Sequence, residues 1–302
     1  MRIPEAFARN VGEVWGDPGR EWLRELPALQ AGVLRDWELT AAEPYRLSFN
    51  WVVPVRRADG TPAVLKLGVP QSGHLTGEAT ALTFFAGRGA VEVLAYDAAR
   101  GALLIERAEP GTMVRELVPE HDEQATAVLI DTMRRLHRPP PPGLALEELS
   151  GRTESFAAHL RRYAPGDDPV PRYLVERAGR LFGELCATAT ERVVLHGDLH
   201  HDNVLAAGRE PWLAIDPHGV IGDPGYELGA LLYNPMTSDA PIAGLLPSRI
   251  EQLADGLAMP VERVVAWGFA QAVLSLVWTA EGDGKINGRD LEVALSLWSR
   301  LP

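Results

Sequence analysis

The sequence has one cysteine, few lysines and a shortage of positive charge. The single Cys186 cannot form an internal disulfide, which fits a reducing compartment. The chain has 29 lysines and arginines and 41 acidic residues, which gives a formal net charge of −12. A negative field repels phosphate backbones and anionic lipid headgroups. Nucleic acid and anionic membranes are therefore poor partners, and a small cationic ligand is favoured.

Long hydrophobic runs are also missing. The longest uncharged run, residues 264–280, is interrupted by polar residues and is shorter than the ~20 residues that span a bilayer, so it predicts a buried helix. The opening residues, MRIPEAFARNVGEVWG, lack the apolar core of a signal peptide. We therefore expect a cytoplasmic protein. With 302 residues, 46% of them hydrophobic, the chain is large enough for two domains or one bilobal unit.

The first third of the chain predicts an antiparallel sheet that carries one helix. Short helices up to Trp37 are expected to break at Pro18 and Pro27. An Asp59-Gly60 turn between two apolar runs is a strong hairpin signal. The predicted elements are strands at 49–56, 62–67, 91–96 and 102–106 and a helix at 75–88.

The remainder is mainly helical, with one β-rich island. Helices are predicted at 120–137, 151–163 and 171–187 and again towards the C-terminus, with Pro139–Pro142 as extended loop. The island spans residues 192–216. The change in character near Glu106–Gly111 indicates a small sheet domain at 1–107 and a larger helical domain at 108–302.

The island contains the most specific pattern of the chain. The segments are V-V-L-H-G-D-L-H-H-D-N-V-L at 193–205 and W-L-A-I-D-P-H-G at 212–219. A tight loop between two short strands would bring Asp198, Asn203 and Asp216 together. One carboxylate can orient a hydroxyl and accept its proton, while an amide oxygen and the other carboxylate hold Mg²⁺ against a triphosphate.

These segments resemble the catalytic and metal-binding loops of the kinase fold, in the form used by aminoglycoside phosphotransferases. L-H-G-D-L-H-H-D-N-V-L-A-A, W-L-A-I-D-P and G-D-P-G-Y-E-L are most similar to the streptomycin 6-phosphotransferase and hydroxyurea-kinase branch. The resemblance covers nearly the whole chain and is most specific at 193–228. It implies an α+β, bilobal, protein-kinase-like fold with a small antiparallel-sheet lobe and a larger helical lobe.

The resemblance assigns roles position by position. Asp198 matches the catalytic aspartate, and Asn203 and Asp216 match the residues that bind magnesium. Lys66, one of only two lysines, matches the lysine that contacts the α- and β-phosphates of ATP. Its expected partner is Glu78, the only acidic residue between Ser72 and Arg88.

Other nucleotide contacts follow the same resemblance less closely. Glu106 and Ala108 belong to the segment that resembles the interlobe linker, whose backbone would bind the adenine edge. Ser48 and Asn50 stand where a glycine-rich loop would cover the phosphates, but this segment has no glycine. Gly197 replaces the arginine of protein kinases. No A-P-E-like segment follows Asp216, so a protein substrate is not expected.

Candidate substrate contacts are Asp223, Glu227 and His200. Asp223 also fits a role in bracing the catalytic loop, and His200 also fits a solvated position. His196 is expected to be structural. The C-terminal helices carry an acidic surplus that would either line a cationic site or form a solvated face: Glu251, Asp255, Glu281 and Asp283.

The resulting hypothesis is a small-molecule kinase that transfers the γ-phosphoryl of ATP to a hydroxyl of an aminoglycoside, with streptomycin as the expected acceptor. A kinase of the same fold for hydroxyurea or another metabolite is the first alternative, and a pseudoenzyme is another. A metal-dependent hydrolase that uses the loop histidines is a distant one, because the H-x-H-x-D-H spacing is absent.

Overall fold

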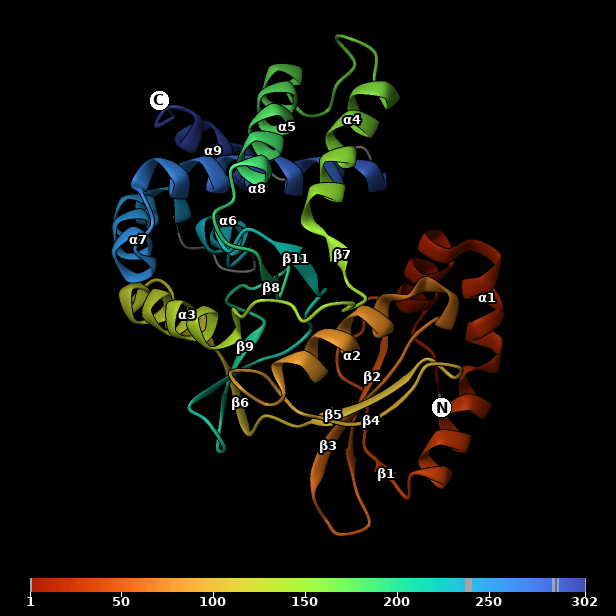
Figure 1. Cartoon of the computed structure of the whole chain (residues 1–302). Helices are drawn as coiled ribbons and strands as arrows, with labels where there is room; N and C mark the ends of the chain where they lie inside the picture. The colour runs from red at the N-terminus through yellow and green to blue at the C-terminus, as the bar shows by residue number, and fades with distance from the viewer. Residues whose placement is uncertain (1, 237–240, 284–285, 287, 302) are drawn as a thin grey trace. The chain divides into compact units, whose positions relative to one another are not determined.

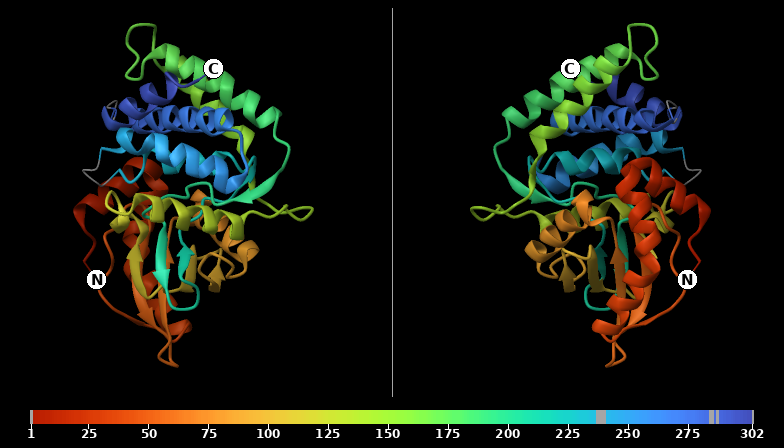
Figure 2. Two further views of the ribbon diagram at one scale, coloured as in Figure 1. Left: turned by 90° about the vertical axis from the view of Figure 1, so that its left-hand side faces the viewer. Right: turned by 90° about the vertical axis from the view of Figure 1, so that its right-hand side faces the viewer.

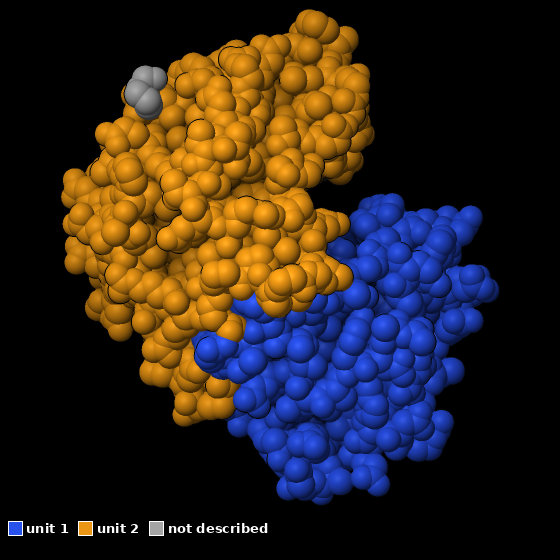
Figure 3. Space-filling model, viewed as in Figure 1, with its two compact units in different colours: residues 1–111 blue, residues 112–302 orange. Residues whose placement is uncertain are grey.

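The computed structural model describes residues 2–236, 241–283, 286 and 288–301. It divides into two compact units, Met1–Gly111 and Thr112–Pro302 (Figures 1 and 3). The first unit holds the five-stranded sheet and the second holds most of the helices, so the α+β class expected from the sequence is confirmed.

Unit 1 is built on a five-stranded antiparallel sheet with the order β1-β2-β3-β5-β4. The strands are β1 (Thr40–Ala41), β2 (Trp51–Arg56), β3 (Pro62–Leu67), β4 (Val93–Asp97) and β5 (Ala102–Glu106). The predicted Asp-Gly hairpin forms: Gly60 has φ +84°, and the Asp59 carboxylate accepts a hydrogen bond from the Thr61 amide at 2.9 Å. This turn sets a register in which Lys66 faces Val52 across the β2–β3 pair.

One helix follows the hairpin, as predicted. Helix α2 (His74–Phe85) ends three residues before the expected Arg88, because Ala86 adopts a left-handed conformation with φ 51°. A single 3-10 turn, Pro70–Ser72, precedes it.

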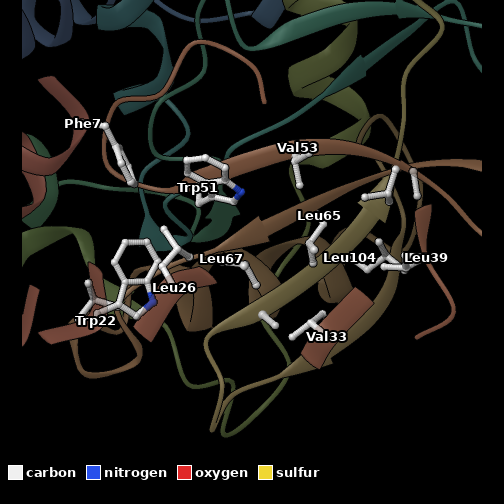
Figure 4. Close-up of a cluster of buried hydrophobic side chains, with 14 of the residues drawn as sticks. Phe7, Trp22, Leu26, Val33, Leu39, Trp51, Val53, Leu65, Leu67 and Leu104 are labelled. Atoms are coloured by element: carbon white, nitrogen blue, oxygen red, sulfur yellow. The ribbon is translucent and has the colours of Figure 1, made fainter. Parts of the chain in front are cut away.

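Helix α1 (Glu5–Asp36) corrects one of the predicted breaks. The helix is interrupted at Gly16, with φ 57° and ψ −133°, two residues before Pro18. Pro27 lies inside the helix and does not end it. The helix continues because its apolar side chains, Trp22, Leu26 and Val33, are buried against the sheet, and this packing outweighs the hydrogen bond that a proline removes. Figure 4 shows these side chains beside Trp51, Val53 and Leu65 in the core of unit 1.

Unit 2 is mainly helical. Its helices are α3 (Asp122–Leu136), α4 (Thr153–Arg162), α5 (Arg172–Ala187), α6 (Tyr226–Tyr233), α7 (Ile242–Leu257), α8 (Val261–Asp283) and α9 (Gly288–Trp298). Helix α8 packs against α5, α6 and α9 in the centre of the unit (Figure 2). It is long and apolar enough to cross a membrane, but 78% of its apolar window is buried inside the protein. It is therefore the buried helix that the uncharged run predicts.

Short strands interrupt the helices. They are β7 (Glu147–Glu148), β8 (Val193–Leu195), β9 (Val204–Ala207), β10 (Trp212–Ala214) and β11 (Val220–Gly222), with β6 (Pro110–Met113) at the boundary of the units. Strands β9 and β10 form an antiparallel pair, while β11 lies between β8 and β7. Two further 3-10 turns cover Val114–Leu117 and Leu149–Arg152.

A buried ion pair fixes α7 against α3. Arg249 donates two hydrogen bonds to the Asp122 carboxylate, at 2.9 and 2.6 Å, and is 1% exposed. It also donates to the carbonyl of Asn234 at 2.6 Å, beyond the end of α6. The charge is therefore satisfied on several sides, as burial of an arginine requires.

Candidate active site

In unit 1, Lys66 and Glu78 form a buried ion pair. Lys66 Nζ lies 2.6 Å from Glu78 Oε1, and each residue is 4% exposed. The β-ladder places Lys66 opposite Val52 on one side and Leu103 on the other, while Glu78 comes from the buried face of α2. The two residues that the sequence pairs are therefore in contact, and the sheet fixes where the ammonium group lies.

The segment from Tyr45 to Asn50 is held by contacts with helix α1. Asn10 in α1 donates a hydrogen bond to the Ser48 carbonyl at 3.3 Å, and the Trp15 ring lies 6.0 Å from that of Phe49. The Asn50 amide oxygen is buried and has no hydrogen-bond partner among the described residues. Ser48 and Asn50 thus belong to a segment anchored by α1.

The predicted linker residues lie at the end of β5. The Glu106 amide donates to the Glu92 carbonyl at 2.8 Å, and the Glu106 carboxylate accepts from the Glu92 amide at 3.1 Å. Ala108 follows two residues later and is half-buried. The side chain of Glu106 is therefore engaged by the backbone of the chain next to β4.

In unit 2, His196 supports the loop that follows β8. Its ring is fully buried, with Nε2 2.8 Å from the Ile215 carbonyl, while Nδ1 accepts from the Asp198 amide at 3.3 Å. Burial lowers the pKa of His196 to about 4, so the ring is neutral at physiological pH. A neutral ring that donates at Nε2 and accepts at Nδ1 connects the loop after β8 to the strand that leads to Asp216.

The three residues of the predicted magnesium and catalytic site meet in this loop. Asn203 Nδ2 donates to the Asp198 carbonyl at 2.9 Å and to its carboxylate at 3.3 Å. The Asn203 carbonyl accepts from the Ile215 amide at 2.9 Å, directly before Asp216. Asp216 has φ 64°, a left-handed conformation that aspartate tolerates better than most residues. The structure therefore joins Asn203 directly to Asp198 and holds the residue before Asp216 against Asn203.

Asp198 is kept ionised by its neighbours. Its carboxylate lies 3.6 Å from His200 Nε2 and 4.0 Å from His218 Nε2. Burial disfavours the charged form, but the hydrogen bond with His200 and the nearby imidazoles outweigh it and lower the pKa of Asp198 to about 2. The carboxylate is therefore available to orient a hydroxyl group at neutral pH.

His200 is occupied by contacts within the loop. It lies between the carboxylates of Asp198 and Asp202, and its side chain is largely buried. Its Nδ1 lies 3.2 Å from the Asp202 amide nitrogen. The next residue, His201, is also buried, and neither of its ring nitrogens has a hydrogen-bond partner among the described residues.

Asp223 and Glu227 are both buried inside the protein. They are 3% and 1% exposed. Asp223 accepts from the Gly225 amide at 2.7 Å and pairs with Arg263, while Glu227 accepts from the Gly197 amide at 2.8 Å. Glu227 thus braces the loop, while Asp223 holds the turn before α6 to α8, and both contacts disfavour the substrate-contact role considered for these residues. Burial raises the pKa of Glu227 to about 7.

The described residues of the acidic surplus are exposed to solvent. Glu251, Asp255 and Glu281 are all exposed. The side chain of Asp283 lies outside the described residues. Exposure of these carboxylates fits the solvated-face interpretation of the surplus.

Sequence reasoning missed two residues near Asp198. His218 lies within the D-P-H-G segment, so its position two residues after Asp216 was a signal that could have been used. Arg152 donates to the Gly197 carbonyl at 3.0 Å. It comes from a 3-10 turn far earlier in the chain, and no local pattern marks it.

The donor set suits Mg²⁺. Because the hydrogen bonds of the Asn203 amide use its nitrogen, the amide oxygen is the atom that would ligate a metal, together with a carboxylate oxygen of Asp216. Oxygen ligands of this kind, completed by substrate phosphates, are typical of magnesium sites. Among the residues that the structure describes, no group of three His, Cys, Asp or Glu side chains is arranged to hold a metal ion.

Sequence comparison decides the family. A family model described as aminoglycoside/hydroxyurea antibiotic resistance kinase matches residues 37–284. The chain belongs to this family. As a member of the aminoglycoside/hydroxyurea antibiotic resistance kinases it is a phosphotransferase, which confirms the enzyme class that the loop motifs predict.

Two relatives of this kinase family match almost the full chain. A streptomycin 6-kinase from Streptomyces griseus is 34% identical over 288 residues, 93% of this chain and 92% of that protein. A hydroxyurea phosphotransferase from Kitasatospora aureofaciens is 37% identical over 301 residues, 98% of this chain and 85% of that protein. The branch that the sequence resembles is therefore confirmed.

Solved structures show the same fold at low identity. An aminoglycoside phosphotransferase aligns with a TM-score of 0.62 at 14% identity, over 90% of this chain and 99% of that one. A choline/ethanolamine kinase family protein from Mesorhizobium loti also gives 0.62, at 19% identity and over 92% of each chain. These two proteins are named for different substrates. The structural similarity therefore confirms the kinase-like fold and does not identify the acceptor.

Proposed function

We propose that this kinase transfers the γ-phosphoryl group of ATP to a hydroxyl of an aminoglycoside, with streptomycin as the acceptor. The observation that carries the proposal is the arrangement of Asp198, Asn203 and Asp216. The side-chain amide of Asn203 donates a hydrogen bond to Asp198, and the backbone carbonyl of Asn203 accepts one from the residue before Asp216. The buried Lys66–Glu78 pair supplies the second element that phosphoryl transfer from a nucleotide requires.

Each residue has a definite task in the proposed reaction. The Asp198 carboxylate orients the acceptor hydroxyl and takes its proton as the oxygen bonds to the γ-phosphorus, while the bond to the bridging oxygen of ADP breaks. Lys66, held by Glu78, contacts the α- and β-phosphates. Asn203 and Asp216 hold magnesium, which when bound neutralises charge on the phosphates.

The remaining predicted residues serve the nucleotide. Ser48 and Asn50 contact the phosphates in place of a glycine-rich loop, and the backbone at Glu106 and Ala108 binds the adenine edge. Residues 1–107 thereby form the nucleotide-binding domain, and residues 108–302 carry the catalytic loop and the acceptor site. We place the reaction in the cytoplasm, where ATP is available and the single cysteine remains reduced.

Charge supports a cationic acceptor. The chain carries a formal net charge of −12, and a field of this sign raises the local concentration of a polycation such as streptomycin. The first relative described above is named for that substrate. Hydroxyurea is the second candidate, because the relative named for it has 37% identity over a longer alignment. Hydroxyurea is uncharged and gains nothing from the field.

The test is Mg²⁺-dependent ADP release with streptomycin, other aminoglycosides, hydroxyurea and no acceptor. Release stimulated by streptomycin, with a kcat/KM that falls as salt is added, supports the proposal. Stimulation by hydroxyurea alone, without salt dependence, assigns the second candidate. Phosphorus NMR of the product identifies the modified hydroxyl. Absence of transfer to every acceptor would overturn the proposed substrate.

A further inference from the structure

The residue before the catalytic aspartate is held at both of its backbone polar groups. Gly197 has φ +85°, a conformation that favours glycine. Its amide donates to Glu227 Oε1 at 2.8 Å, and its carbonyl accepts from Arg152 Nη1 at 3.0 Å. The two contacts fix the peptide groups on either side of Gly197, and the second of these peptides carries the Asp198 amide.

Arg152 reaches this carbonyl from a well-defined position. It ends the 3-10 turn Leu149–Arg152, directly before α4. Its guanidinium carbon lies 5.1 Å from the centre of the Tyr226 ring and 5.4 Å from that of Trp278, and Nη1 also bonds the Tyr226 hydroxyl. Cation–π contacts and a hydroxyl bond restrict the guanidinium, so little additional ordering is needed to bind the Gly197 carbonyl.

The glycine also leaves room for this arrangement. A Cβ at position 197 would lie 3.2 Å from His218 Cβ and 3.4 Å from Arg152 Nη2. Arg152 Nη2 is in turn 3.4 Å from His218 Nδ1. Protein kinases carry an arginine at this position of the loop, and here the guanidinium beside the loop comes from another part of the chain.

We propose that Arg152 is a positioning residue for phosphoryl transfer, acting through the Gly197 carbonyl on the orientation of Asp198. The inference rests on the proposed function, because it gives Asp198 the role of catalytic aspartate. Arg152 does not need to contact ATP, magnesium or the reacting hydroxyl. The charge of Arg152 strengthens its hydrogen bond to the Gly197 carbonyl. Without this bond the Asp198 carboxylate would be displaced and would meet the acceptor hydroxyl in a less productive geometry.

Steady-state kinetics of Arg152→Gln and Arg152→Lys provide the first test. We expect kcat to fall on the order of 10²-fold in the glutamine variant, with KM for ATP and the melting temperature unchanged. Lysine keeps the charge but cannot reproduce the planar guanidinium, so we expect it to recover only part of the loss. A melting temperature that falls in proportion to kcat would instead assign Arg152 to packing and overturn the proposal.

Arg162→Gln is the matched control. Arg162 is the last residue of α4, at the opposite end of that helix from Arg152. It donates to the carbonyl of Glu281 at 3.1 Å, and its guanidinium carbon lies 5.5 Å from the centre of the Tyr163 ring. Neither contact involves the catalytic loop. We expect this variant to retain wild-type kcat, and an equal loss in both variants would overturn the specific role of Arg152.

Chemical rescue supplies a readout that a packing role would not move. In Arg152→Ala, added guanidinium chloride at millimolar concentration is expected to raise kcat in a saturable manner, because the Tyr226 and Trp278 rings retain a site for the free cation. Sodium chloride at equal ionic strength controls for screening, and Arg162→Ala controls for the cation itself. Absence of rescue together with an unchanged kcat in Arg152→Gln overturns the proposal.

Hydrogen exchange tests the contact without requiring activity. We expect amides in the peptide covering residues 193–203 to exchange about tenfold faster in Arg152→Gln than in the wild type, and not in Arg162→Gln. Unchanged exchange overturns the positioning role. If the wild type phosphorylates none of the acceptors, the proposed function fails, while faster exchange in the variant still establishes that Arg152 holds the loop.

Discussion

The loop at 196–203 and the segment at 45–50 are both expected to act on phosphates, yet they are built in opposite ways. In the loop, the buried His196 and Glu227 and the partly buried Arg152 bind the backbone from several directions. The segment at 45–50 is anchored by few contacts, including Asn10 and a ring contact to Phe49, which is 42% exposed.

The difference shows why one region is recognisable in the sequence and the other is not. A loop held by many specific hydrogen bonds tolerates few residue types at each position, so it keeps a motif. A segment held by few side-chain contacts admits many sequences of similar shape. The comparison also predicts where substitution has a large effect and where it has a small one.

The largest effect is expected at Asp198. Substitution Asp198→Asn removes the base and should lower kcat by about 10³–10⁴-fold, while the partly exposed side chain leaves the fold intact. ADP release and the melting temperature are the measurements. Asp202→Asn is the control in the same loop, because Asp202 pairs with Arg115 at 2.7 Å. Substantial activity in Asp198→Asn would contradict the assignment.

The next largest effect is expected at the ion pair of the sheet unit. Lys66→Met should reduce kcat/KM for ATP by about 10²–10³-fold, because the variant lacks the charge that faces the phosphates. Lys66→Arg is not expected to restore it in a buried site. Glu78→Gln should act through the same lysine, so the double variant should lose less than the sum of the two singles. Strict additivity would contradict the pairing.

Glu227 gives a pH-dependent effect of intermediate size. Burial raises the folded-state pKa of Glu227 to about 7 from the ordinary value of 4.5. The contribution of this group to the free energy of unfolding is therefore fully present below pH 4.5 and is lost as the pH rises to about 7. Glu227→Gln lacks this titration. Chemical denaturation from pH 5 to 8 should show the variant gaining about 1–3 kcal/mol relative to the wild type. A constant difference across this range would refute the raised pKa.

The smallest effect is expected in the segment at 45–50. Asn50→Ala and Ser48→Ala should each raise KM for ATP no more than about fivefold, the size of one neutral hydrogen bond, with kcat unchanged. Asn10→Ala, which removes the bond to the Ser48 carbonyl, should have a comparable effect. A loss of more than 10²-fold in either variant would show that this segment is as constrained as the catalytic loop.

Local patterns predict much of the fold and the central constellation. The Asp59-Gly60 turn determines the hairpin and therefore the position of Lys66 opposite Val52. The β-rich island places Asp198, Asn203 and Asp216 within a short stretch of chain, so their meeting follows from two short strands. The break expected at Pro27 is wrong because tertiary packing of α1 outweighs the local preference of proline.

Contacts between distant segments could not be predicted in this way. Arg152 and Gly197 are 45 residues apart, and nothing in the sequence around either one indicates the hydrogen bond. Asp223 and Glu227 are acidic residues next to a motif, which makes them resemble ligands for a cation. Only the packing of α6 and α8 shows that they are buried and used for bracing.

Helix α1 has a practical consequence for anyone who shortens the gene. The family match begins at residue 37, so a trimmed protein that follows it would lack the whole helix. The sheet would then present Trp51, Val53 and Leu65 to water, an apolar surface of the kind that promotes aggregation. We expect such a truncated protein to accumulate in inclusion bodies and to show no activity, although every residue of the loop at 196–203 is present.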